Sequence, residues 1–295
     1  MTAHCIHLRD RGQEGVWRLL DEVRRTPAHH EMLAGRRALC LLAEHSPAAL
    51  EDRLSFGESL RAGGAGWQEI LPEGWLRDMD ALTLQAPLYA AHADMLLVHG
   101  LEERLLTVFA AESTAPVLNM GNAAGHPALA LADLALMHES VDDLSTLRVA
   151  WVGGLNGLAF SLMEAAMYVP FELFMAIPEW SDPDHGLLDL ALRAGAKIFL
   201  SREPALVLDG AHFVYCGAGP RAAAGSPLQA ALPLRAEDMA LALPEAHMLT
   251  AESLSPACRA EDSLLEAARP LWTRRLQMRT AVQTLLLRDL LEASA

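Results

Sequence analysis

The fold is decided by the stretch PVLNMGNAAGHPALALADLALMHE, residues 116–139. The apolar run at residues 115–120 indicates a buried strand, and a glycine-containing turn follows it. The leucines and alanines after the turn recur at helical spacing and predict a helix over residues 127–139. Pro127 suits the first position of this helix, because a backbone N–H would have no partner there. A strand, a turn and a helix in this order are typical of a parallel sheet with helices on its faces.

The same alternation extends through the chain on both sides of this stretch. The first half adds strand candidates at residues 38–43 and 94–98 and helix candidates at residues 14–25, 48–61 and 101–112. After the acidic segment 140–147, where we place a domain boundary, the second half has strand candidates at residues 148–154, 171–179, 196–201 and 211–219, and helix candidates at residues 158–169, 186–195 and 271–292. Residues 63–66 and 220–262 are expected to form loops, the second with short helices. The chain is therefore predicted to be an α/β protein with two doubly wound parallel-sheet domains.

The composition indicates a well-cored protein and argues against several kinds of partner. The chain has 295 residues, of which 52% are hydrophobic and 21% charged, which suits two domains of ordinary size. A formal net charge of −15 argues against nucleic acid and anionic membranes, since either needs a basic face. The four cysteines form no CxxC pair, so neither a zinc site nor a disulfide framework is expected. A polar N-terminus and the lack of a membrane-length apolar run lead us to expect a cytoplasmic protein.

Two junctions between a strand and a helix contain candidate chemistry. Glycines in VGGLNG, residues 152–157, allow a ligand to approach the backbone, but Leu155 and Leu158 stand where a dinucleotide fingerprint needs glycine. A tight turn is therefore favoured over an NAD site. His126 precedes a helix, where a neutral imidazole donates well to a developing oxyanion, although a local capping role is the commoner one. The segment DPDH, residues 182–185, is interpreted as a helix N-cap and not as a metal site.

Three blocks of the chain resemble the aspartate/ornithine transcarbamylase superfamily, and its ornithine branch most closely. Residues 116–139 match a family pattern of PVIN, a variable loop, HPxQ and a helix carrying LAD and a Glu. Residues 149–166, VAWVGGLNGLAFSLMEAA, are similar to the family's strand, GDxNN turn and NSL helix. Residues 274–282, RRLQMRTAV, resemble its ENRLHxQKAV motif and place Arg275 on a functional arginine. The blocks occur in the family's order and spacing, and the resemblance covers nearly the whole chain.

The resemblance implies a fold, a reaction and a set of site residues. Residues 1–140, completed by the C-terminal helix 271–295, would form a carbamoyl phosphate-type domain, and residues 141–270 an amino-acid-binding-type domain. The family transfers a carbamoyl group from carbamoyl phosphate to an amine, without metal or organic cofactor, usually as a homotrimer. Backbone N–H groups and arginines of an STRTR loop hold the phosphate, and further donors polarise the carbamoyl carbonyl. The implied catalytic residues are His126 and Arg275, and the implied substrate-binding residues are Ser46, Arg53, His99 and Asn156.

The phosphate-binding loop departs from the family pattern. Its counterpart lies in EHSPAALEDRLSF, residues 44–56, and two registers are possible. Counting from the preceding strand aligns Ser46 with the first serine of STRTR. Counting back from the SF pair aligns Arg53 with the last arginine and puts Glu51 on the phosphate-gripping arginine. In either register one arginine or both are missing, and we expect Glu51 or Asp52 near the pocket to repel phosphate.

Other substrate contacts of the family are also replaced. His99 stands in place of an arginine, Leu129 in place of the Gln of HPxQ, and Gly157 in place of the second Asn of the turn. The ornithine-gripping loop corresponds to Gly217 and the residues after it, which lack its carboxylate and serine. The losses fall on the substrate contacts and spare the scaffold.

Three functions therefore stay open. The first is a non-catalytic or re-purposed transcarbamylase homologue that binds a carbamoyl phosphate-like or amino-acid-like ligand or a partner. The second is an active carbamoyltransferase with an unusual donor or acceptor, motivated by the retention of His126 and Arg275. The third, an NAD-type oxidoreductase, has only the second-domain sheet in its favour.

Overall fold

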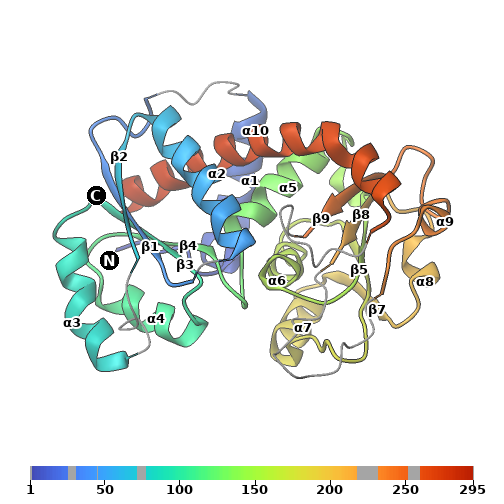
Figure 1. Cartoon of the computed structure of the whole chain (residues 1–295), viewed down its shortest axis with the longest axis horizontal. Helices are drawn as coiled ribbons and strands as arrows, with labels where there is room; N and C mark the ends of the chain where they lie inside the picture. Colours follow the sequence, from blue (N-terminus) through green and yellow to red (C-terminus); the bar gives the residue numbers. More distant parts are fainter. Residues whose placement is uncertain are drawn as a thin grey trace. The chain divides into compact units, whose positions relative to one another are not determined.

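The structure is a computed structural model that describes residues 2–25, 31–44, 46–71, 78–217, 232–251 and 260–294. The chain divides into two compact units, which are described separately. Unit 1 comprises Met1–Ala135 and Leu276–Ala295, and unit 2 comprises Leu136–Arg275. Figure 1 colours the chain from blue at the N-terminus to red at the C-terminus. Each unit is built on one parallel sheet, so the predicted α/β fold with two parallel sheets is confirmed.

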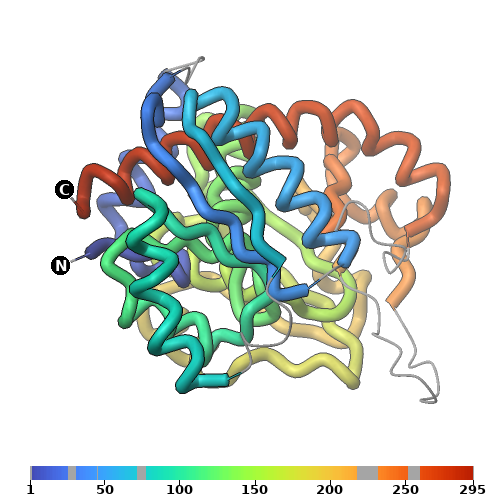
Figure 2. Tube along the Cα trace, turned by 60° about the vertical axis from the view of Figure 1, so that its left-hand side comes forward, coloured from blue at the N-terminus to red at the C-terminus, as the bar shows by residue number. Residues whose placement is uncertain are grey.

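Unit 1 has a four-stranded parallel sheet with the strand order β2-β1-β3-β4. The strands are β1 (Arg37–Leu42), β2 (Gly66–Ile70), β3 (Met95–His99) and β4 (Val117–Gly121). The helices are the short η1 (Leu8–Arg11), α1 (Gly12–Arg25), α2 (Pro47–Gly63), α3 (Met79–Ala90), α4 (Glu103–Glu112), the start of α5 (Pro127–His138) and the end of α10 (Asp262–Ala293). Figures 1 and 2 show α3 and α4 together on one side of this sheet and α2 and α10 on the other. Cover on both faces explains why β3 and β4 consist of buried residues throughout.

Two elements of unit 1, β2 and α3, are not predicted from the sequence. Strand β2 lies at the edge of the sheet and mixes polar with apolar residues, so it lacks the apolar run that is typical of a buried strand. Its first residue, Gly66, was expected in a loop. Helix α3 contains Pro87, which lacks a backbone N–H and interrupts the helical pattern.

Unit 2 has a five-stranded parallel sheet with the strand order β7-β6-β5-β8-β9. The strands are β5 (Arg148–Val152), β6 (Glu172–Ala176), β7 (Lys197–Ser201), β8 (Phe213–Cys216) and β9 (His247–Thr250). The helices are η3 (Leu144–Thr146), α6 (Gly157–Ala165), α7 (His185–Arg193), α8 (Ala205–Leu208) and α9 (Ala236–Met239). The predicted N-cap in residues 182–185 is confirmed, because the Asp184 side chain accepts hydrogen bonds from Gly186 N and Leu187 N.

The segment 220–262 departs from its prediction as loop with short helices. It contains strand β9, which pairs in parallel with β8 and completes the sheet. Four residues are too few to show a periodic pattern, which explains why this strand was not predicted. Residues 218–231 and 252–259 of this part of the chain lie outside the described residues.

The C-terminal helix α10 begins at Asp262, ahead of its predicted start at residue 271, and continues through Pro270. Its last part is fixed in unit 1 by the buried Asp289, whose carboxylate pairs with Arg18 of α1 at 2.8 Å and with Arg11 of η1 at 3.3 Å. No helix in the described ranges is both long and apolar enough to cross a membrane.

Candidate functional site

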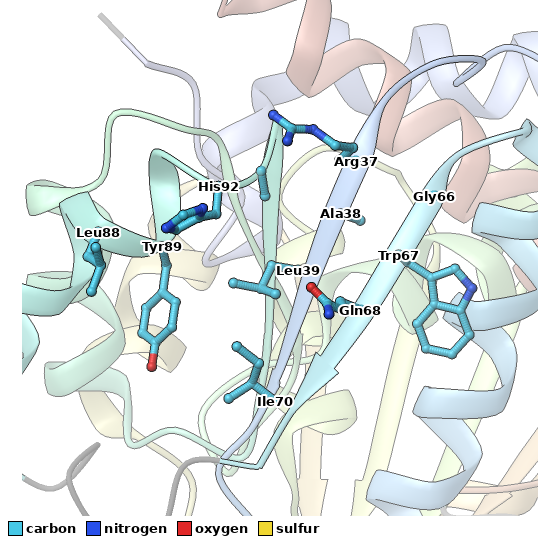
Figure 3. A pocket seen from close by; sticks show the side chains of 11 residues that line it. Arg37, Ala38, Leu39, Gly66, Trp67, Gln68, Ile70, Leu88, Tyr89 and His92 are labelled. Carbon is cyan, nitrogen blue, oxygen red and sulfur yellow. The ribbon is translucent and has the colours of Figure 1, made fainter.

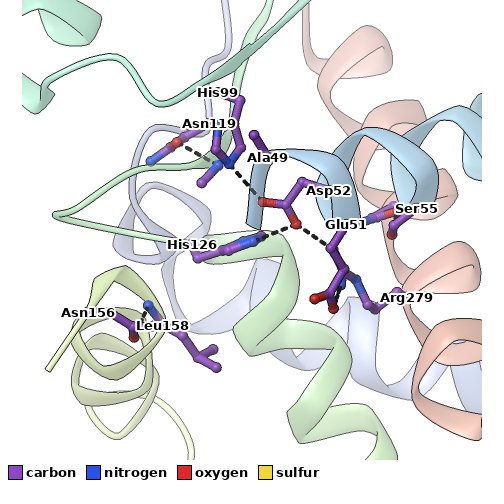
Figure 4. Close-up of polar contacts among 12 residues, drawn as sticks. Ala49, Glu51, Asp52, Ser55, His99, Asn119, His126, Asn156, Leu158 and Arg279 are labelled. Atoms are coloured by element: carbon purple, nitrogen blue, oxygen red, sulfur yellow. Dashed lines mark hydrogen bonds and ion pairs between the residues drawn. The ribbon is translucent and has the colours of Figure 1, made fainter. Parts of the chain in front are cut away.

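A buried carboxylate, Asp52, lies at the centre of a polar cluster in unit 1 (Figure 4). Its Oδ2 is 3.0 Å from His99 Nε2, and its Oδ1 is 2.9 Å from His126 Nε2 and 2.5 Å from Arg279 Nη2. The neighbouring Glu51 accepts from Arg279 Nη1 at 2.6 Å. We call these five residues, Glu51, Asp52, His99, His126 and Arg279, the Asp52 cluster. Only 4% of the Asp52 side chain and 2% of the Arg279 side chain are exposed, so both charges are removed from water.

The fold brings the histidines of the cluster to one edge of the sheet. His99 is the last residue of β3, and His126 directly precedes α5, which follows β4. Strands β3 and β4 are parallel neighbours, so their carboxyl ends meet at the same edge, where polar groups gather in such sheets.

The acidic and basic members of the cluster come from two helices packed against each other. Helix α2 starts at its N-cap Ser46, whose side chain accepts from Ala49 N at 3.0 Å. Asp52 lies on the buried face of α2 together with Ser55 and Ser59. Both serine hydroxyls donate to Gln283 Oε1 on α10, at 2.8 and 2.6 Å. Because Gln283 is one helical turn beyond Arg279, the same helix pairing aligns Arg279 with Asp52.

The charge state of Asp52 follows from its partners. Burial by itself would raise the pKa of the Asp52 carboxyl. The charge and hydrogen bond of His126, the hydrogen bond of His99 and the charge of Arg279 outweigh burial and hold that pKa well below its ordinary value. An ionised carboxylate only accepts hydrogen bonds, so both imidazoles must carry their proton on the Nε2 that faces Asp52.

This depressed pKa predicts a pH dependence of stability that Asp52→Asn removes. A carboxylate whose pKa is lowered by folding stabilises the folded state above its unfolded pKa, about 3.9, and loses that contribution as the pH falls toward the folded value. We expect wild type to exceed Asp52→Asn in free energy of unfolding at neutral pH, and this excess to shrink as the pH falls below about 4. Urea denaturation of both proteins from pH 7 to pH 3 measures this difference. A difference that is independent of pH would contradict the assignment.

A glycine makes room for the cluster. Gly121, at the end of β4, has a φ of +152°, and a Cβ atom there would lie 2.9 Å from Asp52 Oδ2 and 2.9 Å from His126 Cδ2. The backbone of β4 therefore forms one wall of the space that the Asp52 carboxylate fills. Two nitrogens at the cluster, His99 Nδ1 and Arg279 Nε, are buried without a hydrogen-bond partner among the described residues.

The other residues singled out from the sequence lie outside these contacts. Ser46 is the N-cap of α2. Arg53 has a side chain that is 48% exposed and pairs with Glu69 at 2.6 Å. In unit 2, Asn156 caps α6 by accepting from Leu158 N and Ala159 N (Figure 4), and the buried Arg275 donates from Nη1 to Thr250 O at 2.8 Å. The structure thus brings His99 and His126 together around a residue, Asp52, that was not predicted to bind them.

Arg279 was not singled out from the sequence, and Asp52 was expected only as a negative charge near the pocket. The structure pairs both Asp52 and Glu51 with Arg279, so two carboxylates share one guanidinium. A signal for Arg279 exists in the sequence, because it follows Arg275 by four residues and so lies on a neighbouring part of the same helix face.

A separate cavity of about 560 Å³ lies in unit 1 between the edge of the sheet and α3 (Figure 3). It is lined by Leu39 and Ile70 from the sheet, by Tyr89 from the end of α3 and by His92, which follows this helix. Figure 3 shows Trp67 turned to the other side of β2. No group of three or more potential metal ligands occurs in the parts of the chain that the structure describes.

Comparison with known proteins shows similarity to ornithine carbamoyltransferases, although no family model matches the chain. The ornithine carbamoyltransferase of Nitratidesulfovibrio vulgaris strain Hildenborough is 38% identical over 218 residues, which cover 72% of each protein. That of Oleidesulfovibrio alaskensis is 34% identical over 218 residues, with the same coverage of 72%. Among solved structures, the anabolic ornithine carbamoyltransferase of Campylobacter jejuni aligns with a TM-score of 0.84 at 20% identity, covering 98% of this chain and 99% of that one. The enzyme from Pyrococcus furiosus gives a TM-score of 0.82 at 19% identity, with 97% and 96% coverage.

Proposed function

This chain belongs to the ornithine carbamoyltransferase family, and we propose that it is a member whose transferase reaction is lost or strongly impaired and whose fold serves binding or regulation. The proposal concerns the substrate site alone. The reaction requires donors aimed at the oxyanion that develops on the carbamoyl group and cations that hold the phosphate. The Asp52 cluster uses donors of both kinds for internal contacts.

The observation that carries the proposal is the contact between His126 and Asp52. The family resemblance assigns His126 to the carbamoyl carbonyl, yet its Nε2 faces the Asp52 carboxylate at 2.9 Å. A donor that is already bonded to a full negative charge in a buried site stabilises a developing oxyanion poorly. If His126 exchanges its charge-assisted hydrogen bond with Asp52 for one with the oxyanion, the transition state is stabilised by little net free energy.

The charges of the cluster support the same conclusion. Arg279 is 2% exposed and already pairs with two carboxylates, those of Glu51 and Asp52. A phosphate group entering beside them would meet two negative charges for one arginine. At an effective dielectric constant near 20, each such contact at about 4 Å costs roughly 4 kcal/mol before any compensation.

The direct test is citrulline formation from carbamoyl phosphate and ornithine. We expect purified protein to show no citrulline above the uncatalysed background, since removing single oxyanion donors already costs about 10²- to 10³-fold in related chemistry. The Nitratidesulfovibrio vulgaris ornithine carbamoyltransferase, assayed at the same enzyme concentration, is the matched control. Turnover by this chain within about tenfold of that control would refute the proposal.

A second candidate is an active carbamoyltransferase with another acceptor. The retention of His126 and of a buried Arg275 favours it. The same assay is repeated with a panel of amino-acid amines in place of ornithine, and the release of inorganic phosphate is measured. This measurement distinguishes the active transferase from the non-catalytic protein. Phosphate release that depends on one of the amines would favour this candidate, and its absence with every amine supports the non-catalytic function.

Three further properties are proposed from the resemblance to the family. The ligand would be a small molecule of the carbamoyl phosphate or amino-acid type, the assembly a homotrimer and the location the cytoplasm. Light scattering of the purified protein gives the mass that distinguishes a trimer from a monomer.

A further inference from the structure

We propose that the Asp52 carboxylate is a built-in occupant of an anion-binding pocket formed by His99, His126 and Arg279, which keeps this pocket closed to external small oxyanions. The inference rests on the proposed function, because it explains how the site of that function is blocked. The pocket would accept a small monovalent oxyanion such as a carboxylate once the Asp52 side chain is shortened.

The geometry of the contacts is that of a bound anion. Three N–H donors from separate parts of the chain converge on one carboxylate group. They lie at the end of β3, directly before α5 and in the middle of α10. All three distances lie between 2.5 and 3.0 Å, so each donor is in direct hydrogen-bonding contact with the carboxylate. The carboxylate is tied to the chain only through Asp52 on α2, so the donors form a pocket that is distinct from the helix supplying the anion.

Two of the donors, His99 Nε2 and Arg279 Nη2, depend on Asp52 for their contact. The only hydrogen bond or ion pair that the described residues provide to His99 Nε2 is with Asp52, and the other ring nitrogen of His99 has no hydrogen-bond partner among them. When the Asp52 carboxylate is removed, Arg279 Nη1 still donates to Glu51 Oε1, but Arg279 Nη2 loses its acceptor. Buried N–H donors without an acceptor destabilise the folded protein, and an external anion of the right size would supply the missing acceptor.

The tether explains why the native pocket excludes external anions. A carboxylate held by its own chain binds in an intramolecular step, with an effective concentration that free anions in solution do not reach. Shortening Asp52 to serine removes the tethered carboxylate and vacates the positions of its two oxygens. The wall next to that space is the backbone of Gly121, which has no side chain to fill it.

Charge distinguishes between possible ligands. Formate placed in the pocket of Asp52→Ser restores the single negative charge and the planar shape of the native carboxylate. Inorganic phosphate is larger and carries up to two negative charges. The Glu51 carboxylate, which pairs with the same Arg279, would repel it. The proposal therefore expects formate to bind more tightly than phosphate.

The experiment measures melting temperature and calorimetric binding of Asp52→Ser with sodium formate, sodium phosphate and sodium chloride at matched ionic strength. We expect the melting temperature of Asp52→Ser to rise with formate concentration in a saturable way, and its apparent affinity for formate to exceed that of wild type by at least tenfold. Asp52→Ser combined with Arg279→Gln is the matched control and is expected to lose the formate effect. Equal responses of wild type and Asp52→Ser to formate would overturn the proposal.

Asp52→Ser could fail to fold in chloride, and refolding then provides the measurement. The recovery of soluble, cooperatively melting protein is compared after refolding in formate and in chloride. Greater recovery in formate supports the pocket, and equal recovery in both salts overturns it. Citrulline formation by wild type would instead refute the proposed function, without depending on the formate result.

Discussion

Replacing Arg279 with methionine is expected to lower the free energy of unfolding by roughly 3–5 kcal/mol. The guanidinium is 2% exposed and compensates two carboxylates, Asp52 at 2.5 Å and Glu51 at 2.6 Å. Methionine keeps much of the apolar volume of the arginine stem, so the loss reports on the charge and not on packing. The Asp52 carboxylate then remains buried with imidazole donors alone, and an uncompensated buried charge is among the most destabilising changes known.

A matched control is available on the same helix. Arg269 of α10 pairs with Glu266, and both side chains are more than 60% exposed. Arg269→Met is expected to change the free energy of unfolding by about 0–1 kcal/mol, because solvent screens exposed pairs. Urea denaturation of the two variants and wild type at neutral pH gives both numbers. Similar small losses for the two variants would mean that Arg279 is hydrated in solution, and the account of the cluster as a buried site would be wrong.

Gly217→Ala is expected to destabilise unit 2 by about 3 kcal/mol. A Cβ atom at Gly217 would lie 2.5 Å from Trp151 Nε1 and 2.9 Å from Gly154 O. Trp151 is fully buried, donates its indole N–H to Gly154 O at 3.2 Å and packs on Tyr215 with 5.3 Å between ring centroids. The indole therefore cannot turn aside without losing its hydrogen bond and its packing.

The control for this variant is Gly66→Ala in unit 1. A Cβ atom at Gly66 would meet nothing closer than 3.9 Å, and its φ is not in the left-handed region. Thermal melting and urea denaturation should show a large loss for Gly217→Ala and little change for Gly66→Ala. An equally small effect at Gly217 would show that the backbone at Gly217 shifts easily, contrary to the close packing around Trp151.

The scaffold was predictable because its elements repeat with local periods. The stretch 116–139 forms β4, a turn and α5 as expected, and the restart after residue 147 forms β5 and α6. The missed strands, β2 and β9, are edge strands with four or five residues each, too short and too mixed in polarity to show a period. Strand β9 owes its position to pairing with β8, a contact that joins distant parts of the sequence.

The candidate site was predictable only where a local motif marks it. His126 was found because it lies in a recognisable junction before a helix. Its bond to Asp52 was not found, because the partners of Asp52 lie at residues 99, 126 and 279 and no local pattern joins them. Charges that look repulsive in sequence are paired in space, and only the packing of α2 on α10 reveals this.

The division of the chain has a consequence for the order of folding during synthesis. Unit 1 consists of two segments, and the whole of unit 2 lies between them in the sequence. A ribosome completes residues 136–275 before it makes the last segment of unit 1. Unit 2 therefore has all of its residues while the chain is still growing, whereas the nascent Asp52 has no Arg279 with which to pair. Unit 1 gains its last segment, and with it these buried contacts, only after the whole of unit 2 has been made.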